Sequence, residues 1–112
     1  MAKLLRGDGG VVCDRCTVAD RAPARMKGLL GRKALPSGEG LLLRPAGSVH
    51  TAFMRFPIDV VFLDRELTVL EVVPALAPWR AAGRRGAKAA LELAAGEAAR
   101  RGVAAGDRLV LA

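Results

Sequence analysis

Residues 58–63 constrain the fold more than any other stretch of this chain, because they form a strand pattern that is apolar on both sides. The segment reads Ile-Asp-Val-Val-Phe-Leu and directly follows Pro57. Phe56 precedes that proline and is therefore restricted to extended backbone, so the chain turns there and enters a strand. Alternate side chains of a strand point to opposite faces, so positions 58, 60 and 62 share one face and positions 59, 61 and 63 share the other. A strand that is apolar on both faces is typical of the centre of a sheet.

Strand and turn signals predict a sheet around this segment. Apolar runs bounded by Gly, Pro and Asp predict further strands over residues 4–6, 10–18, 41–43, 67–73, 88–93 and 108–111. The tight turn at residues 64–66 makes the run that follows it the hairpin partner of the central strand. Pro74 and Pro78 predict an irregular connection over residues 74–86.

Two helices complete the predicted fold. One is expected over residues 21–30, with Asp20 as its N-cap, and the other over residues 96–101, closed by Gly102. The sequence shows no repeat and no linker. We therefore predict a single compact α+β domain over residues 1–112, with a mostly antiparallel, barrel-like sheet and two short helices.

Composition limits the classes of partner. Apolar residues make up 52% of the 112 residues, but aromatic residues only 4%, with one Trp and no Tyr, so surfaces for stacking bases are scarce. The formal net charge of +7 favours anionic partners without specifying one, and the basic residues are spread along the chain as on an ordinary soluble surface. The opening residues are charged too often for a signal peptide, and no run reaches the roughly 20 apolar residues of a membrane helix. A cytoplasmic protein with reduced cysteines and no membrane contact is expected.

A polar site is predicted just before the central strand. His50 is the only histidine, and Asp59 begins a strand that is otherwise apolar. An ionised carboxylate at the edge of a core needs hydrogen-bond donors, because leaving it unpaired costs several kcal/mol. Asp59 could accept from backbone N–H groups of its own turn or from Arg55. Alternatively, these three residues converge at the mouth of a pocket lined by Phe53, Met54 and Phe56.

Cys13 and Cys16 form a C-x-x-C motif, but its context argues against a metal or redox role. An offset of three residues in a strand places two side chains on opposite faces. The sequence has no second such motif and one histidine, so one chain cannot assemble a four-ligand zinc site. The motif also precedes the first predicted helix instead of opening it. We predict no metal site and no cofactor, with a metal shared between chains as a remote alternative.

A second candidate surface consists of basic side chains in and after the irregular connection: Arg80, Arg84, Arg85 and Lys88. Trp79 is their only aromatic neighbour. A solvated loop and an arm that contacts nucleic-acid phosphates are both open interpretations. The glycine-containing segment 28–32 is not a phosphate loop, because it lies at the end of a predicted helix, where the dipole repels anions.

Four ordered motifs resemble one family: GLLGR at 28–32, HTAFMRFPIDVVFLD at 50–64, LELAAG at 91–96, and GV with GD at 102–107. This order is similar to domain-of-unknown-function family 192, an uncharacterised prokaryotic family, from about Val12 to the C-terminus. The resemblance implies a small β-rich α+β domain without an established activity, and some members carry an export signal. Many members have Trp at the position of Phe53 and Gly in the turn at 65–66. Phe in place of Trp at position 53 puts a role as an aromatic platform in doubt, whereas the absence of Gly at 65–66 affects only the geometry of the turn.

We therefore predict a small soluble binding or accessory module whose ligand is a small polar molecule or a peptide segment. Its binding residues are expected to be His50, Phe53, Met54, Arg55 and Asp59, with the arginine supplying charge, the aspartate orienting it and the two apolar residues forming a wall. Two alternatives remain. One is an enzyme that uses Asp59 or His50 as a general acid/base, and the other is nucleic-acid binding through residues 80–88.

Overall fold

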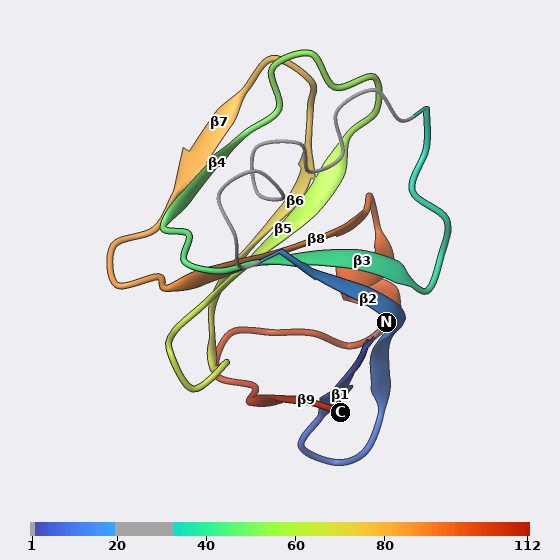
Figure 1. Ribbon diagram of the computed structural model, residues 1–112, viewed down its shortest axis with the longest axis vertical. Helices are drawn as coiled ribbons and strands as arrows, with labels where there is room; N and C mark the ends of the chain where they lie inside the picture. Colours follow the sequence, from blue (N-terminus) through green and yellow to red (C-terminus); the bar gives the residue numbers. More distant parts are fainter. Residues whose placement is uncertain (1, 20–32) are drawn as a thin grey trace.

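The central strand lies where its sequence predicts, with a neighbour on each side. The computed structural model describes residues 2–19 and 33–112 of the chain. Its regular elements (Figure 1) are β1 (Ala2–Arg6), β2 (Val11–Ala19), β3 (Glu39–Leu43), β4 (Ser48–His50), β5 (Ile58–Leu63), β6 (Val69–Leu76), β7 (Ala81–Gly83), β8 (Ala89–Ala94), α2 (Glu97–Arg100) and β9 (Leu109–Leu111). The helix predicted over residues 21–30 lies outside the described residues, and the helix predicted over 96–101 corresponds to α2.

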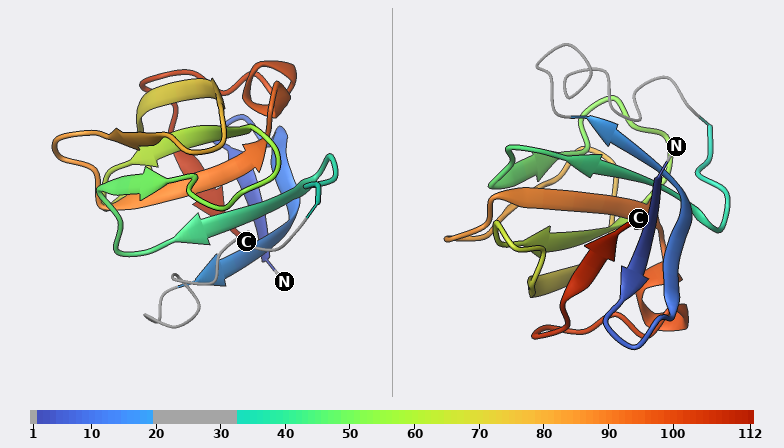
Figure 2. Two further views of the ribbon diagram at one scale, coloured as in Figure 1. Left: turned by 90° about the horizontal axis from the view of Figure 1, so that it is seen from above. Right: turned by 60° about the horizontal axis from the view of Figure 1, so that its bottom comes forward.

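Seven strands form one sheet in the order β6-β5-β8-β3-β2-β1-β9. The pairs are antiparallel except for β2 and β3, which run parallel. The sheet curls until its two edges meet (Figure 2), because the N–H of Leu109 donates to the carbonyl of Leu67 at 2.9 Å and that of Val69 to Asp107 at 2.7 Å. The predicted β-rich, mostly antiparallel and barrel-like sheet is confirmed. The described residues contain one of the two predicted short helices, α2, so the prediction of two helices is not confirmed.

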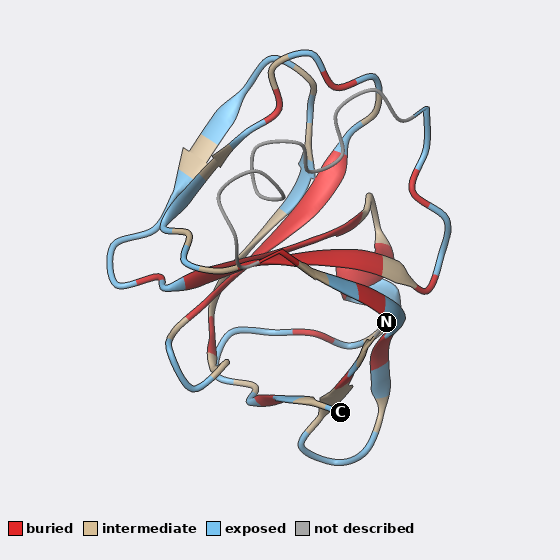
Figure 3. Cartoon of the chain, viewed as in Figure 1, coloured by how far each residue is buried: buried red, intermediate tan, exposed pale blue. Residues whose placement is uncertain are grey.

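The two faces of β5 pack into two separate cores. Val61 and Leu63 belong to an inner core, which is enclosed by the curled sheet and α2. Ile58, Val60 and Phe62 belong to an outer core, which lies between the sheet and a two-stranded sheet of β4 and β7. Figure 3 shows β5 and β8 as the most continuously buried strands. Alternation in the sequence thus assigned each side chain of β5 to the correct layer.

The small β4–β7 sheet was not predicted. Its strands read Ser-Val-His and Ala-Ala-Gly, which carry no strand signature of their own. β6 also continues beyond its predicted end at residue 73 and through Pro74. A bulge permits this, because Val60 pairs with Val73 whereas Ile58 pairs with Leu76. β6 is an edge strand, where a proline that cannot donate to a neighbour is tolerated.

The prediction that Cys13 and Cys16 point to opposite faces is wrong. Leu4 pairs with Cys13 and Ala2 with Cys16, so three residue steps on β2 match two on β1. This bulge inserts one extra residue between the cysteines and returns both thiols to the inner core, where both are fully buried. Interaction with the Cys16 thiol raises the pKa of the Cys13 thiol far above its ordinary value, and burial raises it further.

Candidate functional site

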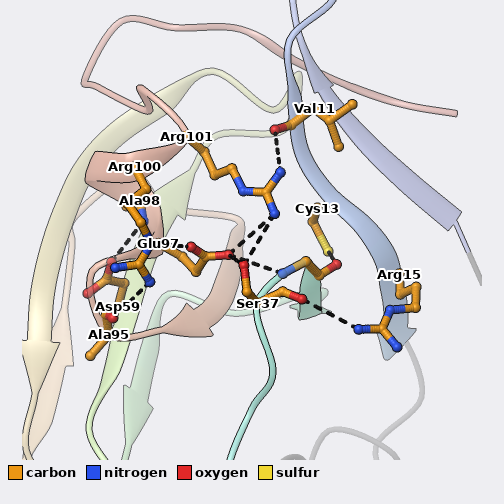
Figure 4. A network of polar contacts seen from close by, with 11 residues as sticks. Val11, Cys13, Arg15, Ser37, Asp59, Ala95, Glu97, Ala98, Arg100 and Arg101 are labelled. Atoms are coloured by element: carbon orange, nitrogen blue, oxygen red, sulfur yellow. Dashed lines mark hydrogen bonds and ion pairs between the residues drawn. The ribbon is translucent and has the colours of Figure 1, made fainter.

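Asp59 is the second residue of β5 and is almost completely buried. Its Oδ1 accepts a hydrogen bond from the N–H of Ala75 at 2.9 Å, and its Oδ2 accepts one from Ala98 at 2.9 Å. Ala98 lies in the first turn of α2 (Figure 4), and Ala75 lies in the bulge of β6. The donors are backbone N–H groups, but they come from distant elements and not from the turn before the strand or from Arg55. Asp59 therefore fastens β5 to both the bulge and the helix.

After the bulge that Asp59 stabilises, residues 77–80 contact a second buried polar residue, Thr51. The hydroxyl of Thr51 accepts from the N–H of Arg80 at 2.8 Å and lies 2.6 Å from the carbonyl oxygen of Ala77, to which it donates. Its own carbonyl accepts from the N–H groups of Met54 at 3.1 Å and Trp79 at 3.0 Å. These contacts join the loop 51–57 to the loop 77–80. A lone threonine gives no sequence signal for this role.

An exposed aromatic pair lies on these two joined loops. Phe53 is 70% exposed and Trp79 is 60% exposed. Their ring centroids are 4.6 Å apart, with the rings inclined at 61°. Both residues have a left-handed backbone, with φ of 66° and 63°, which costs about 1–2 kcal/mol for each L-residue. The backbone at both positions is therefore strained, and both large apolar rings are exposed to solvent. Backbone strain together with exposed apolar side chains is found at binding sites.

The other predicted site residues divide between surface and interior. His50 ends β4 and is exposed, and Arg55 is exposed in the loop that carries Phe53. Met54 is 6% exposed and packs in the outer core, so it supports the loop from below. In the part of the chain that the structure describes, no hydrogen bond joins Asp59 to His50 or Arg55. The structure thus brings Phe53, His50 and Arg55 to the surface and keeps the carboxylate of Asp59 apart from them.

Glu97 is a buried carboxylate that sequence reasoning did not single out. It accepts hydrogen bonds from the Ser37 hydroxyl at 2.5 Å, the Gly38 N–H at 3.1 Å and the Arg100 guanidinium at 2.7 Å (Figure 4). Burial raises the pKa of Glu97, but these hydrogen bonds and the charge of Arg100 lower it more strongly, to about 2. Every partner belongs to the protein itself. Glu97 therefore secures α2 to the loop before β3.

Glu92 is the second buried carboxyl that sequence reasoning missed. It points into the outer core from β8, between the paired residues Leu41 on β3 and Val60 on β5, and is 5% exposed. No described residue donates a hydrogen bond to it, and burial raises its pKa to about 7. The only signal in the sequence was one acidic residue within the apolar run Leu-Glu-Leu. With a pKa of about 7, this carboxyl keeps its proton to a higher pH than an exposed carboxyl does.

The basic residues of the predicted nucleic-acid surface do not share one environment. Arg80 follows Trp79 directly, and its guanidinium donates to the Trp79 backbone carbonyl at 3.3 Å, so it lies on the same loop as Trp79. Arg84 forms an ion pair with Glu71 at 3.1 Å. Arg85 and Lys88 are exposed on the connection between β7 and β8.

Two further searches concern residues 2–19 and 33–112. Within these ranges, no three side chains among His, Cys, Asp and Glu gather in a way that could hold a metal ion. The same ranges contain no helix with the length and apolar character needed to cross a lipid bilayer.

Two solved structures share this fold. A protein of unknown function from Novosphingobium aromaticivorans is 24% identical, with a TM-score of 0.82 over 97% of this chain and 82% of its own. A putative transcription regulator from Sinorhizobium meliloti is also 24% identical, with a TM-score of 0.84 over 98% of this chain and 91% of its own. A comparison with curated proteins gives no match. The family model DUF192, described as "Uncharacterized ACR", matches residues 4–111. The chain therefore belongs to domain-of-unknown-function family 192.

Proposed function

We propose that this protein is a binding module and that its binding surface is the aromatic tip, which we define as Phe53 and Trp79 with the flanking His50, Arg55 and Arg80. The observation that carries the proposal is the exposed, left-handed pair of aromatic residues. Neither strain nor exposure of a large ring benefits an isolated domain. A ligand that covers the rings would bury apolar area and offset this cost.

The chemistry of the aromatic tip favours a peptide segment that carries an apolar side chain beside an acidic one. The two inclined rings offer an apolar edge and face, and aromatic and arginine side chains are the usual anchors of protein interfaces. Arg55 and Arg80 are exposed next to the rings and provide charge for a carboxylate. In this proposal Asp59 and Thr51 hold the loops of the aromatic tip in position through backbone hydrogen bonds and do not touch the ligand.

The alternatives have less support. An acid/base role for Asp59 conflicts with its burial and with two hydrogen bonds that already occupy both oxygens. Nucleic-acid binding is favoured by the basic charge and by the description of the Sinorhizobium meliloti protein as a putative transcription regulator, although a likeness at 24% identity bears on the fold alone. Binding of that kind would weaken steeply with salt and would depend on Arg84 and Arg85.

Trp79 provides a direct test, because it is the only Trp and the chain has no Tyr. We would titrate the protein with an acetylated, amidated peptide of alternating Glu and Leu and follow the tryptophan emission. A Lys and Leu peptide is the charge-reversed comparison, and duplex DNA tests the alternative. We expect saturable binding of the acidic peptide only.

Two variants assign the binding surface. Phe53→Ala should weaken binding about tenfold or more, as for other interface anchors. Val110→Ala is the matched control, because Val110 is an exposed apolar residue on β9. The proposal is wrong if Phe53→Ala binds as wild type does, or if the acidic peptide leaves the emission unchanged at every concentration while duplex DNA shifts it.

A further inference from the structure

A separate pocket lies at the opposite end of β5 from the aromatic tip. Its volume is about 380 Å³, which is in the range of small-ligand sites. Its lining comes from three connections between strands and from the first residue of β8: Arg44, Pro45, Asp64, Arg65, Leu67, Lys88 and Ala89. Figure 1 shows these connections, β3 to β4, β5 to β6 and β7 to β8, on one side of the molecule. We call this cavity the basic pocket.

Backbone hydrogen bonds hold the walls of the basic pocket together. The N–H of Lys88 donates to the carbonyl of Leu63 at 2.8 Å, and the carbonyl of Lys88 accepts from Ala46 at 3.1 Å. A further bond of 3.1 Å runs from the N–H of Arg84 to Gly47. The three connections are thus fixed to one another before any ligand arrives. A fixed cavity loses less entropy on binding than one that must first form.

The charge of the basic pocket is unbalanced. Arg65 and Lys88 are exposed cations, Arg44 is a third cation that already has an interaction partner, and Asp64 is the only acidic residue in the lining. The Oδ1 of Asp64 already accepts hydrogen bonds from the N–H groups of Glu66 and Thr68, each at 2.9 Å. Asp64 therefore shapes the turn, and the two exposed cations Arg65 and Lys88 favour an anion.

The rest of the lining is apolar and comes from Pro45, Leu67 and Ala89. Arginine presents a planar fork of donors that fits the oxygens of a phosphate or carboxylate group, while lysine adds a compact positive charge. We propose that the basic pocket binds a small organic anion whose phosphate or carboxylate group meets Arg65 and Lys88 and whose short apolar body lies on the apolar side chains. This site is independent of the aromatic tip and of the function proposed for it.

Two anions test the proposal: inorganic phosphate, which has the charge alone, and butyl phosphate, which adds an apolar body. Calorimetric titration of the full chain at low ionic strength should give saturable binding of both, with butyl phosphate several-fold tighter. Equal affinity for the two would overturn the apolar part of the proposal. Absence of saturable binding of either would overturn all of it.

Paired variants separate a site from a general positive field. Arg65→Ala with Lys88→Ala removes two cations of the basic pocket, both exposed, and should weaken both anions roughly tenfold or more. Lys3→Ala with Arg85→Ala removes the same residue types and the same charge from exposed positions outside the lining, and should leave binding within about twofold of wild type. Equal weakening by the two pairs would show that only net charge attracts the anion, against the proposal. Unfolding free energies of both pairs verify that the fold is intact.

Discussion

Replacing Glu92 by glutamine is expected to stabilise the protein above pH 7 and to leave it nearly unchanged at pH 4.5. Glu92 is buried in the outer core without a described donor, and burial raises its pKa from 4.5 to about 7. In the unfolded chain the carboxyl ionises above about pH 4.5, whereas in the folded protein it keeps its proton up to about pH 7. Between these values the unfolded state binds fewer protons, so the stability of the wild type falls as pH rises.

The size of the effect follows from the two pKa values. A change from 4.5 to about 7 corresponds to about 3 kcal/mol, lost at about 1.4 kcal/mol per pH unit. Glutamine has a similar shape and never ionises, so the Glu92→Gln variant escapes this loss. At pH 8 it should exceed the wild type in unfolding free energy by about 3 kcal/mol, or somewhat less if the folded protein relaxes around the charge.

Urea denaturation followed by Trp79 emission, at several values from pH 4.5 to pH 8.5, measures this difference. Glu66→Gln removes the same charge from an exposed turn and should run parallel to the wild type. Repeating the series in a His50→Ala background removes the single imidazole from the comparison. Glu97 does not interfere, because its pKa is lowered to about 2 and its contribution is lost only as the pH falls below 4.5. Parallel curves for wild type and Glu92→Gln would refute the reasoning.

Three further predictions concern buried polar groups. Thr51→Val should cost about 2–3 kcal/mol of unfolding free energy in urea denaturation, because it leaves two backbone groups without their partner; a loss below about 0.5 kcal/mol would contradict this. Asp59→Asn should cost about 2–4 kcal/mol, because an amide cannot accept at both ends from two N–H donors, and a variant as stable as wild type would contradict the role assigned to Asp59. Cys13 and Cys16 should react with a thiol reagent only at the rate of unfolding, since both are fully buried; rapid reaction of the native protein would show otherwise.

The sequence predicted the fold correctly where the alternation of side chains along a strand determines which face each residue occupies. The alternation within residues 58–63 assigned each side chain of β5 to the correct core, and the turn at 64–66 identified β6 as the partner strand. The same reasoning failed at bulges, where one extra residue changes the face to which the following side chains point. One extra residue between Cys13 and Cys16 reverses their predicted orientation, and nothing in Asp-Arg indicates it. The β4–β7 pair depends on contacts between segments about 30 residues apart, which local propensity does not encode.

The candidate site stays a prediction, and the sequence pointed to only some of the residues that the structure places there. The unusual residues around His50 singled out the loop that carries Phe53 and Arg55, and both of these residues are exposed in the structure. Trp79 drew attention only as a neighbour of basic residues. Its contact with Phe53 depends on left-handed backbone at both positions, which Phe and Trp rarely adopt and which their identity does not announce.

Asp59 is conspicuous in the sequence, but in the structure both of its oxygens accept hydrogen bonds from backbone N–H groups. One of its oxygens holds Ala75, whose φ of 47° is itself left-handed, and so fixes the bulge from which the chain continues to Ala77 and Trp79. Thr51 then clamps that continuation to the loop of Phe53. A buried carboxylate needs hydrogen-bond donors at fixed positions whether those donors belong to the backbone or to a ligand. The donors to Asp59 belong to the backbone, and the chain that follows one of them leads to the proposed aromatic tip.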